Sequence, residues 1–231
     1  MNFKKTVLVA SALCAIPALQ AQVTENYSFS PNLAIPDGNA TGVKDVQTIS
    51  SSIASIADIT VSLNITGDFN GDLAVYLRHD SGFTVLLNRV GVTGVNSFGY
   101  DDHGFDVTFR NDAAHDIHSY RDFSTTTAGA QVVGLWQPDA RDGSPVTGSR
   151  TATLISFQGI NPNGDWTLFA ADLQNGGSTS QVASWGMQIT AVPEPQSIAL
   201  VAGAGLLGFA LWRRKVLYRP AAGRRAPGTL E

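Results

Sequence analysis

Hydrophobic and polar residues alternate along much of the middle of the chain. Large apolar residues occupy every second position of the segments 59–65, 73–77, 105–109 and 185–189, and smaller or polar residues fill most of the positions between them. A period of two places successive side chains on opposite faces of an extended strand. These four segments are therefore predicted to be half-buried β-strands.

Turn-forming residues separate the predicted strands. Gly67-Asp68, Asn70-Gly71, Asp80-Ser81-Gly82 and Asn163-Gly164-Asp165 all interrupt the alternation. No segment between them has the pattern of a long amphipathic helix, and no internal repeat is evident. Short half-buried strands joined by tight turns are typical of an antiparallel sandwich. The sequence therefore predicts an all-β fold.

The N-terminal residues have the layout of a secretory signal peptide. Lys4 and Lys5 precede an apolar stretch over 7–19, and Ala21 provides a plausible cleavage position. We expect residues 1–21 to be removed on export. Cys14 is the one cysteine of the sequence and lies in this segment, so the mature chain is expected to fold without disulfides.

The C-terminal region combines a Pro-Glu-Pro sequence, an apolar run over 198–212 and a basic cluster, in that order. This order resembles the PEP-CTERM sorting tail of exported bacterial surface proteins. The residues that carry the resemblance are Val192, Pro193, Glu194, Pro195, Arg213, Arg214 and Lys215. The resemblance implies an exosortase-type sorting peptidase as a partner, and a protein that is membrane-anchored first and then lies at the cell surface or outside the cell.

We expect residues 192–215 to contain one transmembrane helix, although the apolar run of residues 198–212 is shorter than the roughly 20 residues that usually cross a bilayer. The basic cluster after it would place the C-terminus in the cytoplasm. Residues 216–231 are basic and rich in Pro, Gly and Ala, and we expect this tail to be disordered.

Charge is distributed unevenly along the sequence. Residues 22–196 contain seven Lys or Arg and eighteen Asp or Glu, whereas six basic residues and one acidic residue follow Trp212. Nucleic-acid binding requires a positive surface that displaces the counterions of phosphates. The acidic exported part therefore argues against a nucleic-acid ligand and is compatible with calcium or with a solvated extracellular surface.

Several short motifs appear in the order found in one family of β domains. They are Ile35-Pro36-Asp37, residues 59–66, Gly71-Asp72-Leu73, residues 134–138, residues 157–159, residues 163–168, Asp172 and residues 184–189. This series resembles the P domain, or Homo B domain, that follows the catalytic domain of subtilisin-like proprotein convertases. The resemblance implies an eight-stranded jelly roll over residues 32–191, with Trp166 and Trp185 expected in its core.

The protease that normally accompanies a P domain has no counterpart in the sequence. The interval between Ala21 and Asn32 is too short for a catalytic domain, and no Gly-x-Ser-x-Gly motif is present. Four histidines, at positions 79, 103, 115 and 118, are available to a catalytic triad, and Ser81 near His79 lies in a polar turn. We therefore expect a protein that is not an enzyme.

Two acidic segments are candidates for calcium binding. Asp68, Asn70 and Asp72 present oxygen atoms at alternating positions around a turn, as calcium ligands often do, although the rest of an EF-hand loop is missing. Asp101 and Asp102 follow Tyr100 in a segment that resembles the Phe-Asp-Asp of P domains. The alternative is that both segments are solvated turns. His115 and His118 could share a metal only on a helix, and a polar loop is the alternative there.

These observations support three hypotheses. The first is an exported, non-catalytic module that binds at the cell surface or in the extracellular matrix, with polysaccharide as a ligand and Trp136 as an exposed ring for it. The second is an accessory domain that associates with a separate subtilisin-like serine endopeptidase. The third is an enzyme of a type that the sequence does not reveal.

Overall fold

The computed structural model describes residues 22–124, 129–191 and 195–217. Residues 22–192 form one compact unit, and the two ends of the chain are grouped in a second. We call residues 22–191 the β domain. The helix α1 (Pro195–Leu217) belongs to the second unit and is described separately.

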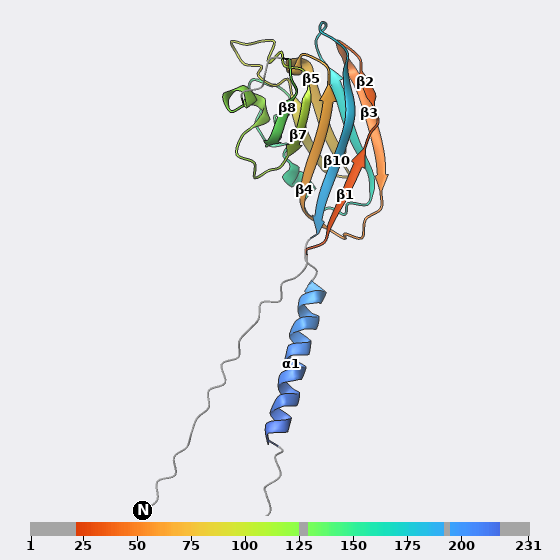
Figure 1. Cartoon of the computed structure of the whole chain (residues 1–231), viewed down its shortest axis with the longest axis vertical. Coiled ribbons are helices and arrows are strands. Elements are labelled where there is room, and N and C mark those ends of the chain that lie inside the picture. The colour runs from red at the N-terminus through yellow and green to blue at the C-terminus, as the bar shows by residue number, and fades with distance from the viewer. Residues whose placement is uncertain (1–21, 125–128, 192–194, 218–231) are drawn as a thin grey trace, which may run out of the picture. The chain divides into compact units, whose positions relative to one another are not determined.

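Two sheets pack face to face in the β domain (Figure 1). Sheet A has the strand order β1 (Thr24–Phe29), β10 (Ser180–Ala191), β4 (Ile56–Thr66), β7 (Phe105–Phe109) and β8 (Val132–Trp136), and β2 (Leu33–Ile35) also pairs with β10. Sheet B has the order β3 (Asn39–Ile49), β9 (Gly164–Asp172), β5 (Leu73–His79) and β6 (Gly82–Asn88). Three short 3₁₀ helices lie over Asn70–Asp72, Ile117–Asp122 and Leu154–Phe157.

The predicted β-sandwich is present, and two of its details differ from the prediction. Strands β7 and β8 pair in parallel, whereas every other pair is antiparallel. The long connection between Phe109 and Val132 explains this, because a parallel pair needs a crossover rather than a tight hairpin. The described residues also form ten strands rather than eight, and β1 begins before the predicted domain start at Asn32.

The alternation read from the sequence determines which side chains enter the core. In β4 the apolar residues 59, 61, 63 and 65 are all buried, and the polar residues between them face outward. Trp166 and Trp185 are among the largest fully buried side chains. Each indole satisfies its N–H group, Trp166 with the Pro162 carbonyl at 2.9 Å and Trp185 with Asp45 Oδ2 at 2.7 Å. Both rings therefore stabilise the space between the sheets without leaving a buried donor unpaired.

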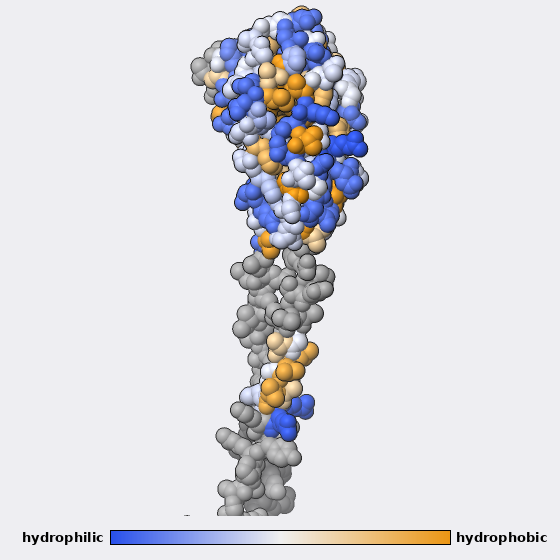
Figure 2. All heavy atoms as spheres, turned by 90° about the vertical axis from the view of Figure 1, so that its right-hand side faces the viewer, coloured by the Kyte–Doolittle hydropathy of each residue, from blue (hydrophilic) through white to orange (hydrophobic). Residues whose placement is uncertain are grey.

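Figure 2 shows a face of the β domain that is mostly hydrophilic, with hydrophobic residues gathered in separate patches. Such a surface is ordinary for a solvated domain, since scattered apolar residues need no partner. The specific binding faces therefore have to be found from the arrangement of individual side chains.

Helix α1 covers the predicted apolar run and extends beyond it at both ends, over 23 residues. The prediction of a transmembrane helix is not supported: none of the helices in the described residues is long and apolar enough to cross a membrane.

Candidate functional site

A shallow trough crosses the outer face of sheet A. Its floor includes Ser62, Thr108 and Leu135, which pair in register across β4, β7 and β8, and the same row continues beyond the lining of the hollow through Gly186 to Ser28. Four of these five residues are small, so the row lies lower than the rows beside it. The hollow has a volume of about 790 Å³ and is open to solvent.

Longer polar side chains border the floor. Asn26, Gln188 and Thr60 form the next row, and Gln188 Nε2 donates a hydrogen bond of 3.0 Å to Asn26 Oδ1. Asp106 of β7 and Arg110, which directly follows that strand, also line the hollow. The trough therefore combines a low floor with hydrogen-bonding groups at its sides.

Five polar side chains of the trough are free to bind a ligand. Within the described residues, the carboxylates of Asp58 and Asp106 and the hydroxyls of Thr60, Ser62 and Thr108 make no side-chain hydrogen bond or ion pair. Carboxylates accept hydrogen bonds, and hydroxyls both donate and accept them. This set can form several hydrogen bonds with a ligand rich in hydroxyl groups.

Tyr27 of β1 is held by the carboxylate of Glu25 on the same strand. Its hydroxyl donates a hydrogen bond of 2.5 Å to Glu25 Oε2, and Ser52 Oγ donates one of 2.5 Å to Glu25 Oε1. Hydrogen bonds from Ser51, Ser52 and Tyr27 lower the pKa of Glu25 to about 2. Glu25 is therefore ionised at neutral pH and fixes the Tyr27 side chain, which packs against the core on the inner side of β1.

In the first candidate calcium segment, two of the three residues, Asp68 and Asn70, are engaged in hydrogen bonds with other parts of the domain. Asp68 accepts hydrogen bonds from the backbone N–H and the hydroxyl of Ser178, and these contacts lower its pKa. Asn70 is fully buried, donates to the Gly104 carbonyl at 3.1 Å and accepts from the Gly104 N–H at 2.7 Å. Both side chains thus stabilise loops, in the way expected of polar groups in turns.

The second candidate segment forms an ion pair instead. Arg121 contacts Asp101, and its Nε donates a hydrogen bond of 2.8 Å to Asp102 Oδ2. The Tyr120 hydroxyl donates to the same oxygen at 2.6 Å, and burial raises the pKa of Tyr120. A guanidinium and a phenol therefore compensate these adjacent carboxylates.

Asp72 differs from the other four candidates. Its side chain is nearly buried, and its Oδ1 has no hydrogen-bond partner among the described residues; Arg89 NH2 lies 4.0 Å away. Burial, with a smaller contribution from the Asp172 carboxylate, raises the pKa of Asp72 to about 6. An orphaned buried oxygen is costly, and a cation would relieve that cost.

The side chains do not assemble into a multidentate metal site. In the part of the chain that the structure describes, no three His, Cys, Asp or Glu side chains are grouped so as to hold a metal ion. His115 precedes the short helix that begins at Ile117, and its ring stacks on Phe123 with centroids 3.7 Å apart. His115 and His118 therefore do not share a helical face, and any cation at Asp72 would need backbone oxygens as further ligands.

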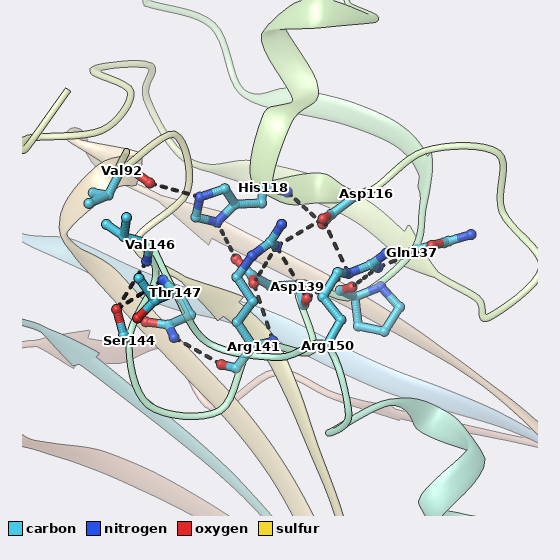
Figure 3. A network of polar contacts seen from close by, with 12 residues as sticks. Val92, Asp116, His118, Gln137, Asp139, Arg141, Ser144, Val146, Thr147 and Arg150 are labelled. Carbon is cyan, nitrogen blue, oxygen red and sulfur yellow. Dashed lines mark hydrogen bonds and ion pairs between the residues drawn. The ribbon is translucent and has the colours of Figure 1, made fainter. Parts of the chain in front are cut away.

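His118 belongs to a buried network of polar contacts (Figure 3). Its Nδ1 lies 2.7 Å from Asp139 Oδ2, and its Nε2 lies 3.0 Å from the Val92 carbonyl. Arg141 NH1 binds Asp139 Oδ1 at 2.9 Å and Asp116 Oδ2 at 2.8 Å. The network joins loops from three parts of the chain and leaves the imidazole no free nitrogen, so its role is structural.

His79 is held in a similar way. Its two ring nitrogens lie 2.9 Å from the Asp165 carbonyl and 2.8 Å from the Asn161 carbonyl, and the ring stacks on Trp166 with centroids 4.3 Å apart. No serine hydroxyl is among its hydrogen-bond partners in the described residues. The expectation that the chain is not an enzyme remains a prediction.

Trp136 does not present an exposed ring. It is 5% exposed, and its N–H group donates to the Val133 carbonyl at 3.1 Å. Leu135, the preceding residue on β8, faces outward. Because successive side chains of a strand alternate, the Trp136 side chain points inward. This burial corrects the expectation that Trp136 serves as a platform for a sugar.

The predicted sorting residues lie only partly within the described structure. Residues 192–194, which include Val192, Pro193 and Glu194, lie outside the described residues. Pro195 begins α1, and Lys215 lies in its last turns. The neighbouring Arg213 and Arg214 are exposed on the same helix.

The trough was not predicted from the sequence, because the alternation indicates which side chains are buried but not how the outward side chains of neighbouring strands are arranged. The alternation predicts that the polar positions 60 and 62 of β4 and 106 and 108 of β7 face outward, but it does not show which of them lie side by side. They become a site because the register of β4 and β7 aligns their short side chains with Gly186. The available sequence signal for the trough was Gly186, a glycine at an outward position of β10.

Comparison with known proteins identifies the sorting region. Residues 191–215 match the family model described as the PEP-CTERM protein-sorting motif. The chain therefore carries the kind of signal found in exported proteins that are sorted to the cell surface. No curated protein sequence matches the chain.

Two solved structures are similar to the β domain. One is the serine protease of Aeromonas sobria in complex with its chaperone, with a TM-score of 0.45 and 12% identity over 76% of this chain. The other is the serine protease of Aeromonas sobria, with a TM-score of 0.41 and 14% identity over 75% of this chain. In both cases the chain spans only 28% of the length of the protease chain.

Proposed function

We propose that the protein is an exported, non-catalytic module that binds extracellular polysaccharide in the trough on sheet A. The observation that carries this proposal is the row of small residues across the sheet, bordered by carboxylate and hydroxyl groups without partners. A polysaccharide presents a line of hydroxyl groups that both donate and accept hydrogen bonds. A trough that crosses the strands suits such an extended ligand better than a compact one.

The sorting motif supports the location that this function requires. A PEP-CTERM signal at residues 191–215 is consistent with export and with processing by an exosortase-type peptidase. An exported module would meet polysaccharide at the cell surface or in the extracellular matrix. We therefore place the β domain outside the cell, where it would help to organise that matrix.

The proposal is tested by offering the purified full chain the polysaccharide and protein fractions of its own cell surface separately. Retention on immobilised polysaccharide, competed by the same polysaccharide in solution, is the expected result. Retention on the protein fraction alone would contradict it. Circular dichroism of the same sample confirms that the β-sandwich is folded.

The alternative is an accessory domain for a separate subtilisin-like protease. The order of motifs shared with P domains, above all residues 163–168 together with residues 184–189, favours this alternative. It needs a protein-binding face rather than a polar trough. Selective capture of a subtilisin-like protease in the protein fraction would support it.

We also propose calcium as a ligand of Asp72. The buried oxygen without a hydrogen-bond partner supports this choice among the five candidate residues. Calcium accepts backbone carbonyl oxygens as well as carboxylates, so one carboxylate can anchor it. Calcium would act there by stabilising the loop and would take no part in polysaccharide binding.

A further inference from the structure

The outer face of sheet B carries a group of aromatic side chains. Tyr76 of β5 pairs in register with Phe169 of β9, and their rings stack with centroids 5.7 Å apart and planes 8° apart. Phe83 of β6 lies 5.7 Å from Tyr76 at an angle of 48°. All three are half-buried and point away from the core, because Leu77 and Leu168 face inward. The face therefore presents a continuous aromatic strip across three strands.

The backbone of β3 packs against Phe169 at one end of the strip. A Cβ atom at Gly42 would lie 2.7 Å from Phe169 Cζ, so the backbone of β3 approaches the edge of this ring closely. Gly42 has a φ of +57°, which favours glycine. The hydroxyl of Tyr76 makes no hydrogen bond within the described residues and is available to a ligand.

The same face holds the two unpaired cations of the β domain. Ion pairs engage the other five basic residues of 22–191, namely Arg89, Arg110, Arg121, Arg141 and Arg150. Lys44 and Arg78 make no ion pair or side-chain hydrogen bond among the described residues. Both are exposed and occupy outward positions of sheet B.

Strand register places these cations beside the rings. Lys44 pairs with Phe169, which pairs with Tyr76, so Lys44 and Tyr76 are two strand spacings apart, or roughly 10 Å. Arg78 follows Tyr76 by two residues on the same face, about 7 Å along the strand. The nearest acid on this face of β9, Asp165, lies beyond Thr167 and accepts a hydrogen bond of 2.5 Å from Thr48.

We infer that this aromatic and basic face of sheet B is a second binding site, and that its ligand is an anionic polysaccharide such as a uronic-acid polymer. Sugar rings stack on aromatic side chains through their apolar faces, and their carboxylates bind Lys44 and Arg78. Both features occur together on this face, in a domain whose other basic residues are neutralised. Because the trough lies on the opposite sheet, one molecule could join two polysaccharide chains.

The charge pattern favours this ligand over an apolar partner. An apolar protein surface would leave Lys44 and Arg78 without counterions at the contact, which costs free energy when they lose water. A polymer of carboxylated sugars provides the counterions and remains hydrated. Binding through two exposed cations should weaken as salt screens them.

The test measures binding of the full chain to alginate, a polymer of uronic acids, and to neutral dextran, by affinity electrophoresis at low and high salt. We expect the double variant K44Q/R78Q to bind alginate roughly tenfold more weakly and to lose most of the salt dependence. The matched control R213Q/R214Q removes two exposed cations from helix α1, outside both proposed sites, and should bind alginate as the wild type does. Y76L, which keeps apolar volume without a ring, should weaken alginate binding at both salt concentrations.

A trough variant separates this inference from the proposed function. S62Y fills the trough and should retain alginate binding, whether or not the trough binds another polysaccharide. The inference is overturned by wild-type alginate binding that K44Q/R78Q leaves unchanged, by loss of alginate binding in S62Y, or by no alginate binding at all. Sedimentation that shows the wild type, but not K44Q/R78Q, as a dimer without alginate would also overturn it, because the occupant would then be a second copy of the chain.

Discussion

His118 and Asp139 form a deeply buried contact between polar side chains in the β domain, with 2.7 Å between Nδ1 and Oδ2 and with Asp139 fully inaccessible to solvent. The other ring nitrogen of His118, Nε2, lies 3.0 Å from the Val92 carbonyl oxygen. The pair therefore connects the loop at Val92 to the segment that contains Asp139, next to the edge of sheet B.

Neutralising Asp139 should strongly destabilise the domain. D139N keeps the shape of the side chain but leaves His118 and Arg141 without their shared buried anion, a change that typically costs about 3–5 kcal/mol. Denaturant unfolding measures the difference. The control D112N breaks the exposed pair of Arg110 and Asp112, which should cost no more than about 1 kcal/mol. Equal effects of the two substitutions would contradict a structural role for the network.

The carboxyl group of Asp72 should make the free energy of unfolding fall as the pH rises. An ordinary ion-paired carboxylate has the opposite effect, because its pKa is lowered in the folded state. The pKa of Asp72 is raised to about 6 in the folded state, so the folded chain binds more protons than the unfolded chain between about pH 4 and pH 6. Stability contributed by this group is therefore present below pH 4 and is lost as the pH rises through 6, by an amount on the order of 1–3 kcal/mol.

The difference between the wild type and D72N isolates this effect. The free energy of unfolding, measured at several values between pH 4 and pH 7, should fall with rising pH more steeply in the wild type. D72N should equal the wild type near pH 4 and exceed it at pH 7. Parallel curves for the two proteins would show that Asp72 does not titrate in this range.

Calcium should act on the same carboxylate. At pH 7, millimolar calcium is expected to raise the thermal midpoint of the wild type and to leave D72N unchanged. A concentration of 100 times the dissociation constant would stabilise the folded state by about 2.7 kcal/mol. An equal shift of the thermal midpoint in both proteins would show that calcium binds at a site other than Asp72. No shift in either protein would contradict the proposal that calcium binds the domain.

The core was predictable because a period of two specifies which side chains are buried wherever one face of a strand is apolar. Ile59, Val61 and Trp185 are buried for this reason. The parallel pairing of β7 with β8 was not predictable, because it depends on the path of residues 110–131, where polar and apolar residues have no clear period.

The candidate calcium residues show the limit of local patterns. Asp101 and Asp102 look like a cation site in sequence, but their counterion is Arg121, about 20 residues later in the chain. Asp68 is likewise bound by Ser178 from the other end of the domain. Only the fold brings such partners together, so acidic spacing alone could not separate a hydrogen-bonded carboxylate from one such as Asp72, whose buried Oδ1 has no hydrogen-bond partner among the described residues.

The central claim is that the trough on sheet A binds polysaccharide, and blocking it is the most direct test. S62Y places a ring over the floor at an outward position, where it should not disturb the core. T24Y places the same ring on the outer face of β1, at a position that does not line the trough. Binding of each full chain to the polysaccharide of its own cell surface is then compared by isothermal titration calorimetry. We predict that S62Y loses binding and that T24Y binds as the wild type does; undiminished binding by a correctly folded S62Y would contradict the account.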